Sequence, residues 1–280
     1  MQKTFYFPYA YLWPSRGDFS EFLPLGKDIK RTYTASMNQQ TSVKDIFGKA
    51  ISAYYHEKDN TDIEVHSPDF DDDVIPVPYL FRSYAEMPSL ERKALQLAKG
   101  RVLDVGSGAG SHSLYLQNNK KLEVTAIDTS AGAIEISRLR GIKNALNINF
   151  FDLKDEKFDT ILMLMNGSGI IGKLRNLDKF FKKAKELLNP GGKILLDSSD
   201  LSYLFDRDED GGIWIDSEAA YYGELEFKVT YKGESSEYFD WLYIDFNTLK
   251  FAAESNNFSC ELIKKGEHFD YLAELQPLKQ

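Results

Sequence analysis

The chain has 280 residues and a formal net charge of −9, from 43 acidic and 34 basic side chains. An acidic surface repels a phosphate backbone, so DNA and large RNAs are poor candidate substrates and we expect no nucleic-acid partner. Hydrophobic residues make up 42% of the chain, and its apolar runs are shorter than the roughly 18 residues of a membrane helix. Cys260 is the only cysteine, which excludes an internal disulfide and favours a reducing compartment. We expect a globular cytoplasmic protein that does not bind membranes.

Residues 1–75 are predicted to form an extension and a helix ahead of the main domain. Residues 1–36 lack both hydrophobic periodicity and the continuous apolar stretch of a signal peptide. We expect them to be irregular, and Met37 is a candidate native start. A helical pattern of apolar residues follows Met37 and continues through Ile51. The acidic, turn-rich stretch 59–73 is expected to be a surface loop.

From residue 76 onward, segments with strand and helix patterns alternate along the chain. The first helix is predicted to end at Gly100. Five short apolar strands are predicted at residues 101–105, 122–127, 145–150, 158–165 and 193–197. Helices are predicted around Leu114 and Leu116 and at residues 130–140 and 174–188. Such alternation is typical of an α/β fold with a doubly wound, mostly parallel sheet.

The alternation changes after Asp200. Two strands joined by a short turn are predicted there, at residues 224–231 and 238–243. An insertion of about residues 201–243 therefore carries a β-hairpin and is a candidate lid. A helix and two final strands, one of them antiparallel, are expected to complete the sheet at residues 246–255, 260–264 and 271–275. Residues 76–280 are expected to form one domain that includes the insertion.

The most informative segment is Val102–Gly110, a predicted strand that leads directly into alternating glycines and then a helix. Gly106 and Gly108 can adopt backbone angles closed to other residues, and without a Cβ they let a ligand lie against the main chain. Gly110 lets the start of the helix pack closely. Asp104 stands at the carboxyl end of the strand, where ligands of open α/β sheets bind. Its carboxylate can accept hydrogen bonds from a cationic amino group.

These residues resemble the first motif of the class I S-adenosylmethionine-dependent methyltransferases, an acid followed by G-x-G-x-G. The resemblance extends over roughly residues 100–200 and implies a Rossmann-like fold with S-adenosylmethionine as cofactor. It also implies that Asp128, which ends the second strand, binds the ribose hydroxyls and that Asp152 lies near the adenine. The implied cofactor-binding residues are Asp104, Gly106, Ser107, Gly108, Gly110, Asp128, Thr129, Phe151, Asp152 and Leu153.

A dinucleotide-binding oxidoreductase also has a glycine loop with an acid some twenty residues later. Its pattern G-x-G-x-x-G requires glycine at position 111, where this chain has Ser111. Asp104 would also repel a pyrophosphate. The sequence therefore favours a methyltransferase acting on a small molecule; the alternative is a protein that binds S-adenosylmethionine as a sensor or scaffold without turnover.

Methyl transfer requires few catalytic side chains, because the sulfonium already makes the methyl group electrophilic. Holding the two reactants in line contributes roughly 7 to 11 kcal/mol, and a lid that excludes water helps further. We expect no metal. The lid candidates are aromatic or basic residues before the core and in the insertion, although these could equally serve as packing: Tyr79, Phe81, Arg82, Tyr84, Trp214, Tyr221, Tyr222 and Trp241.

The segment after the fourth strand, Asn166–Gly169, lies where the resemblance places substrate-facing groups. It differs from the N-P-P-Y of amino-methyltransferases of nucleic acid bases, which also disfavours base methylation. The candidate substrate-binding residues are Tyr79, Arg82, Tyr84, Asn166, Tyr222 and Trp241. His112 and Asp200 are weak candidate catalytic residues, with a solvated first helical turn and helix capping as their respective structural alternatives. We expect a monomer or a homodimer.

Overall fold

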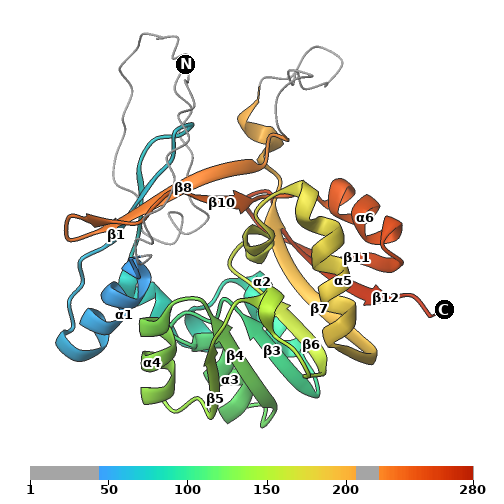
Figure 1. Cartoon of the computed structure of the whole chain (residues 1–280), viewed down its shortest axis with the longest axis horizontal. Helices are drawn as coiled ribbons and strands as arrows, with labels where there is room; N and C mark the ends of the chain where they lie inside the picture. Colours follow the sequence, from blue (N-terminus) through green and yellow to red (C-terminus); the bar gives the residue numbers. More distant parts are fainter. Residues whose placement is uncertain (1–43, 206–220, 280) are drawn as a thin grey trace.

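The structure is a computed structural model that describes residues 44–205 and 221–279 (Figure 1). Its larger sheet has seven strands in the order β11-β12-β7-β6-β3-β4-β5. The five strands predicted between residues 101 and 197 are all present and mutually parallel. Their bounds are β3 Arg101–Val105, β4 Glu123–Asp128, β5 Asn144–Asn147, β6 Phe158–Met163 and β7 Leu188–Ser199. The predictions for residues 1–36, Met37 and Trp214 lie outside the described residues.

The two C-terminal strands are β11 Phe258–Lys265 and β12 Asp270–Pro277. β12 lies between β7 and β11 and is antiparallel to both of them. The predicted α/β fold, a doubly wound and mostly parallel Rossmann-like sheet with an antiparallel strand at the C-terminus, is therefore confirmed.

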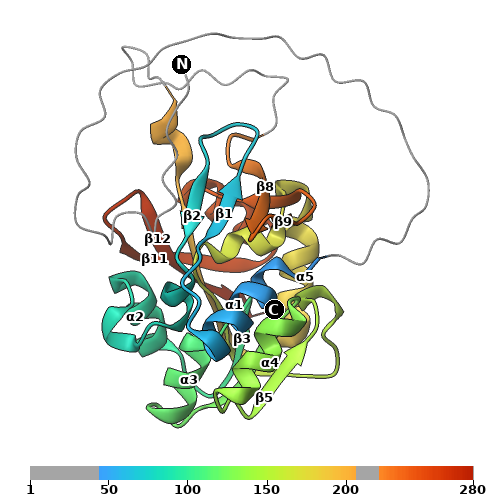
Figure 2. The same ribbon diagram turned by 90° about the vertical axis from the view of Figure 1, so that its left-hand side faces the viewer.

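Helices cover both faces of this sheet, which explains why its central strands are almost entirely apolar. Val102 of β3 belongs to the hydrophobic core formed with α2 Ser89–Leu97 and α3 Ser111–Asn118. The next residue, Leu103, belongs to the opposite core, formed with α5 Leu177–Leu187 and α6 Phe246–Ser255. Figure 2 shows α2 and α5 on opposite sides of the strands.

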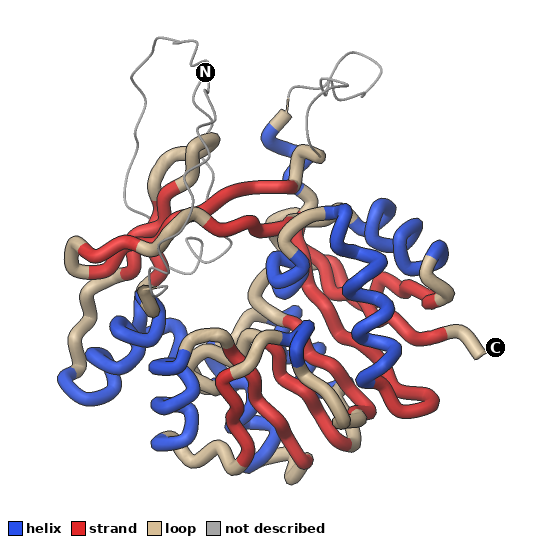
Figure 3. Tube along the Cα trace, viewed as in Figure 1, coloured by secondary structure: helices blue, strands red, loops and turns tan. Residues whose placement is uncertain are grey.

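The second sheet has the order β10-β8-β1-β2, and β9 Glu234–Ser235 also pairs with β8. β8 Glu224–Tyr231 and β10 Phe239–Leu242 are antiparallel neighbours, which confirms the predicted hairpin. Figures 1 and 3 show this sheet as a separate layer above the larger one.

The prediction of a surface loop at residues 59–73 was wrong for part of that range. β1 Ile63–His66 lies within that range and pairs with both β2 Asp73–Ile75 and β8. Ile63 and Val65 are buried in the core of the second sheet. The alternation of apolar and polar residues in β1 is only four residues long, and its acidic neighbours are typical of a loop. Its partner β8 is far away in sequence, so no local pattern indicated the pairing.

Most strand boundaries differ from the prediction by one or two residues, and two differ by more. The third strand ends at Asn147, and a short 3-10 helix, η4 Phe150–Asp152, follows it. The fifth strand begins at Leu188 and not at residue 193, because the predicted break at Asn189–Gly192 stays in the strand with an irregular register. The strand therefore accommodates the Pro and Gly residues at its exposed beginning.

The predicted N-terminal helix is present as α1 Ile46–Glu57, and it packs against α4 Ala131–Leu139. Asp45 caps α1 by accepting a hydrogen bond from Gly48 N. Its other carboxylate oxygen accepts from Gly132 N at the start of α4, at 2.9 Å. A single carboxylate therefore joins the first turns of two helices. This position is favourable because the N-terminus of a helix attracts negative charge.

Candidate functional site

The glycine loop connects β3 to α3 at the carboxyl end of the parallel strands. Gly106 N and Ser107 N both donate to Ile127 O, at 2.9 and 3.0 Å, which fixes the loop against β4. Gly108 has φ +53° and a Cβ there would meet open space, so the main chain is accessible to a ligand. Gly110 has φ +85°, and a Cβ there would collide with the side chain of Ile142. The loop is therefore open on one side and tightly packed on the other.

Asp104 is only 2% exposed at the end of β3. Its Oδ2 accepts a hydrogen bond of 2.6 Å from Ser113 Oγ on α3. Burial raises the pKa of Asp104, while the nearby charge of His112 lowers it. The carboxylate is therefore held in one orientation beside the glycine loop, in a place where a cationic partner would stabilise it.

Asp128 ends β4 and holds the glycine loop directly. Its Oδ2 accepts from Gly108 N and its Oδ1 from Ser130 N, both at 2.8 Å. Burial raises the pKa of this half-buried carboxyl group, and the two backbone hydrogen bonds lower it. Thr129 is exposed next to it, and Ser130 caps α4 through Ala133 N. Asp128 thus has a fixed position and lone pairs left for a diol.

The segment after the third strand divides into two kinds of side chain. Phe151 is half-buried, with Lys179 Nζ 4.6 Å from the centroid of its ring, and Asp152 is exposed. Leu153 is 3% exposed and its side chain packs in the core. Only Phe151 and Asp152 therefore offer side chains to a ligand here.

Three ionisable side chains, Arg82, Glu91 and His112, are buried together beside the glycine loop. Glu91 Oε2 lies 2.5 Å from Arg82 Nη2 and 2.7 Å from His112 Nε2. Arg82, Glu91 and His112 are 6%, 3% and 7% exposed. His112 is therefore not the solvated first-turn residue that its structural alternative described. Arg82 also donates to Tyr79 O, and its guanidinium lies 4.1 Å from the centroid of the Tyr79 ring.

The loop after β6 is held by Asp197 at the end of β7. Asp197 Oδ1 accepts from Gly167 N at 2.9 Å and Oδ2 from Met165 N at 3.1 Å. Burial raises the pKa of Asp197 to about 7. Asn166, only 5% exposed, accepts a hydrogen bond from Ser199 Oγ. These contacts fix the 3-10 helix η5 Gly167–Ile171 at the carboxyl edge of the sheet.

Asp200 lies at the start of the insertion and caps the 3-10 helix η7 Leu201–Leu204 through Ser202 N. Its Oδ1 also accepts a hydrogen bond of 3.0 Å from Tyr222 OH. Tyr222 OH and Tyr221 OH both lie within hydrogen-bond distance of Asp245 Oδ2. Burial raises the pKa of both tyrosines. The cap predicted as the structural alternative is therefore real, and it is part of a tyrosine and carboxylate cluster.

The remaining aromatic candidates lie in different places. Tyr84 stacks on Tyr115 of α3 with ring centroids 4.0 Å apart, and the structure does not bring it to the Arg82 cluster. Phe81 packs under the guanidinium of Arg140. Trp241 lies on Gly169 of η5, and its buried Nε1 has no hydrogen-bond partner in the part of the chain that the structure describes.

Sequence reasoning missed two residues of this region. Glu91 lies three residues before Ala94 and four before Leu95, which puts it on the apolar face of the helix. This spacing was the sequence signal for a buried charge. Ile170 of η5 approaches Gly106, to within 3.0 Å of the position of an ideal Cβ. No pattern in the sequence signalled that contact, because the two residues follow different strands.

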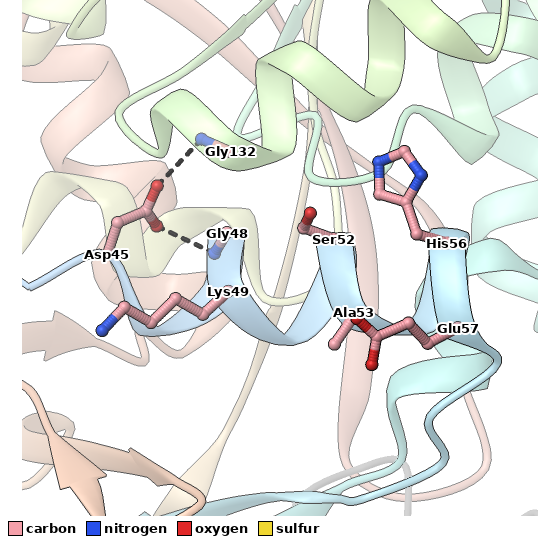
Figure 4. Close-up of a pocket in the computed structure, with 8 residues that line it drawn as sticks. All are labelled: Asp45, Gly48, Lys49, Ser52, Ala53, His56, Glu57 and Gly132. Carbon is pink, nitrogen blue, oxygen red and sulfur yellow. Dashed lines mark hydrogen bonds between the residues drawn. The ribbon is translucent and has the colours of Figure 1, made fainter.

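A groove lies between α1 and α4, next to the Asp45 hydrogen bonds (Figure 4). It is lined by Asp45, Gly48, Lys49, Ser52, Ala53, His56, Glu57 and Gly132.

Within the described ranges, no three His, Cys, Asp or Glu side chains are placed to hold a metal ion. None of the described helices is long and apolar enough to cross a membrane.

A buried hydroxyl in the glycine loop fits a bound cofactor. Ser107 is 8% exposed, and its Oγ has no partner among the residues that the structure describes. A buried polar group without a partner is costly, and a polar ligand against the loop would satisfy it. Together with the open main chain at Gly108, this atom makes the loop suitable for a polar molecule such as S-adenosylmethionine.

Comparisons with known proteins agree with this geometry. A family model described as a methyltransferase domain matches residues 97–244. A S-adenosylmethionine-dependent methyltransferase from Bacteroides fragilis, solved with S-adenosylhomocysteine, is 51% identical with a TM-score of 0.78. The match covers 84% of this chain and 96% of that one. The sugar N-methyltransferase KedS8 from Streptoalloteichus shares the fold, at 13% identity and a TM-score of 0.51, with coverage of 90% and 100%.

The chain also matches parts of curated relatives that act on different substrates. A ubiquinone biosynthesis O-methyltransferase from Chelativorans is 30% identical over 105 residues, which are 34% of this chain and 39% of the relative. A ribosomal RNA small subunit methyltransferase C from Actinobacillus pleuropneumoniae is 35% identical over 105 residues, 34% and 31% of the two chains. The chain spans between 25% and 44% of the length of these curated relatives. The chain belongs to the class I S-adenosylmethionine-dependent methyltransferases, enzymes whose cofactor is S-adenosylmethionine.

Proposed function

We propose that the enzyme transfers the methyl group of S-adenosylmethionine to a small-molecule acceptor. The observation that carries this proposal is the second sheet, which stands over the carboxyl edge of the parallel strands. Ser111 Oγ at the start of α3 donates to Leu80 O in the 3-10 helix η2 Val77–Phe81. η5 packs against β10 at the end of β6. A site roofed in this way suits an acceptor small enough to be enclosed, because a closed site excludes water.

The cofactor is proposed to lie across the ends of β3, β4 and β5. Asp104 would accept hydrogen bonds from the methionine ammonium, and Asp128 from the ribose hydroxyls. The main chain at Gly106, Gly108 and Gly110, with Ser107, would lie against the methionine end of the cofactor. Thr129, Phe151, Asp152 and the backbone of Leu153 would surround the ribose and adenine, as the resemblance implies. The bound cofactor supplies an electrophilic methyl group, and the chain supplies its orientation and the exclusion of water.

The acceptor is proposed to enter beside η5, between the carboxyl edge of the parallel strands and the second sheet. The candidates to line that space remain Tyr79, Arg82, Asn166, Tyr222 and Trp241. Tyr84 is a weaker one, because its ring stacks on Tyr115. His112 and Asp200 keep their place as weak catalytic candidates. His112 bonds to Glu91, and Asp200 to Tyr222, so each has a fixed orientation.

The division of the chain into residues 1–75 and 76–280, with a lid-like insertion at about 201–243, is kept as a proposal with one addition. β1 lies before the boundary but pairs with β8 of the insertion, and it shares a hydrophobic core with that strand. We infer that β1 and the insertion act together as one cover over the site.

The proposal also holds that nucleic acid is not the acceptor. The net charge of −9 supports it, because an acidic protein binds phosphate backbones poorly. The relative that methylates ribosomal RNA makes this a point to test directly. A cell extract is divided by ultrafiltration into small molecules and macromolecules, and each fraction is incubated with enzyme and S-adenosylmethionine. We expect S-adenosylhomocysteine to form with the small molecules. Formation only with macromolecules, abolished by ribonuclease, would refute the proposal.

A further inference from the structure

Five ionisable side chains are buried in one region beside the glycine loop. Glu91 bonds to both Arg82 and His112, at 2.5 and 2.7 Å. Asp104 and Asp197 are 2% and 7% exposed, and both interact electrostatically with Glu91 and His112. Charges that are shielded from water act on one another and on a ligand over longer distances than surface charges do.

Glu91 carries a negative charge in this region. Burial alone would raise its pKa, but the hydrogen bonds and charges of His112 and Arg82 lower it below the ordinary value. Arg82 keeps its positive charge at all relevant pH values. Glu91 and Arg82 are thus one negative and one positive charge placed side by side, and Glu91 interacts electrostatically with Asp104 at the proposed methionine end of the cofactor.

The two forms of the cofactor differ in charge at the sulfur atom, which belongs to the methionine end that we place beside Asp104. S-adenosylmethionine carries a sulfonium, whereas S-adenosylhomocysteine, left after methyl transfer, carries a neutral thioether. The rest of the two molecules is the same apart from the methyl group. A nearby charge therefore changes the affinity for one form relative to the other.

We propose that Glu91 and Arg82 set the preference of the site for S-adenosylmethionine over S-adenosylhomocysteine, with Glu91 favouring the charged cofactor and Arg82 limiting that preference. This inference rests on the cofactor placement proposed above. Glu91 acts through its charge and through the orientation of His112, so it is a specificity-determining residue and not a catalytic one. A balanced pair of this kind lets the product leave after the sulfonium charge is lost.

The test compares two substitutions of opposite charge, Glu91→Gln and Arg82→Met, by calorimetric titration with each cofactor form in the absence of acceptor. The measured quantity is the Kd for S-adenosylmethionine divided by the Kd for S-adenosylhomocysteine. Glu91→Gln should raise this ratio on the order of tenfold, the size of a Coulomb interaction across a partly shielded site. Arg82→Met should lower it, and the double variant should return it close to the wild-type ratio.

The ratio separates charge from structural damage. Removing one partner of a buried ion pair is costly to folding, but both ligands bind the same folded state, so that penalty cancels in the ratio. Glu91→Asp and Arg82→Lys keep the charges and should keep the ratio, which gives a measurement if a neutral variant does not fold.

Ratios that stay at the wild-type value in the neutral variants, or that move in the same direction in both, would overturn the inference. Failure of the wild-type protein to bind either cofactor form would instead refute the proposed cofactor site. The two failures are therefore distinguishable in one set of titrations.

Discussion

The indole ring of Trp241 lies so closely on Gly169 that a Cβ at residue 169 would overlap it. Trp241 belongs to β10 of the second sheet, and Gly169 to η5 at the end of β6. Ile170, the next residue of η5, approaches Gly106 of the glycine loop. The second sheet and the glycine loop are thus connected through two successive residues of the 3-10 helix η5.

Gly169→Ala is expected to lower the free energy of unfolding by about 1 to 3 kcal/mol, the usual range for overpacking. It should also weaken the binding of S-adenosylhomocysteine, because a displaced η5 moves Ile170 against the glycine loop. Chemical unfolding and calorimetry measure the two effects. Trp241→Leu added to Gly169→Ala should recover part of both losses, since it removes the obstructing ring. Equal losses in the single and double variants would show that the contact is not the cause.

Asp128→Ala is expected to weaken the binding of S-adenosylmethionine by roughly 1.5 to 3 kcal/mol for each charged hydrogen bond lost. Part of the effect would come from the loop, because Asp128 also accepts from Gly108 N. Asp128→Asn is the matched variant that keeps one acceptor oxygen in place. It should have an intermediate affinity, and an unchanged affinity in both variants would mean that the ribose binds elsewhere.

The buried carboxyl of Asp197 is expected to make stability depend on pH. Its pKa of about 7 is raised from an ordinary 3.8 by burial, so the folded protein holds a proton that the unfolded chain releases between these values. Stability from this group is complete below pH 3.8 and is lost as the pH rises through 7, by about 4 kcal/mol at most.

Asp197→Asn removes this titration, so unfolding measured from pH 4 to 8 should show a weaker fall in stability than in the wild type. Asp159→Asn is the control of opposite sign. Hydrogen bonds from Arg101 N and Asn189 lower the pKa of Asp159 from the ordinary 3.8, so its contribution is lost only below that pH, and Asp159→Asn should keep the wild-type slope from pH 4 to 8. An Asp197→Asn protein with the wild-type pH profile would contradict the assignment.

Gly132→Ala is expected to destabilise the contact between α1 and α4. A Cβ at residue 132 would lie 2.7 Å from the Cα of Gly48, a backbone atom that cannot move aside. The expected loss is about 1 to 3 kcal/mol in the free energy of unfolding, although alanine is otherwise favoured in helices. Ser52→Ala, in the same groove of Figure 4, is the control and should change stability by less than about 0.5 kcal/mol.

Local sequence patterns were enough to predict the parallel strands of the larger sheet and the position of the glycine loop. Short apolar strands such as residues 101–105 have a local hydrophobic pattern. The glycines after that strand adopt backbone angles that other residue types rarely adopt. Asp104 follows from its place near the end of a predicted strand, because the ends of parallel strands form the edge where ligands bind. Asp128 follows from the family resemblance, which implies an acid at the end of the second strand.

The elements that stand over that edge could not be predicted from local patterns, because long-range contacts place them there. β1 pairs with β8, Glu91 joins Arg82 to His112, and Trp241 lies on Gly169; each contact connects segments with no shared local pattern. Hydrogen bonds between distant strands and the burial of charges depend on which surfaces meet after folding, and periodicity within one segment carries no information about that. The glycine loop is a local feature of the chain, whereas the second sheet over it and the buried charges beside it arise from long-range packing.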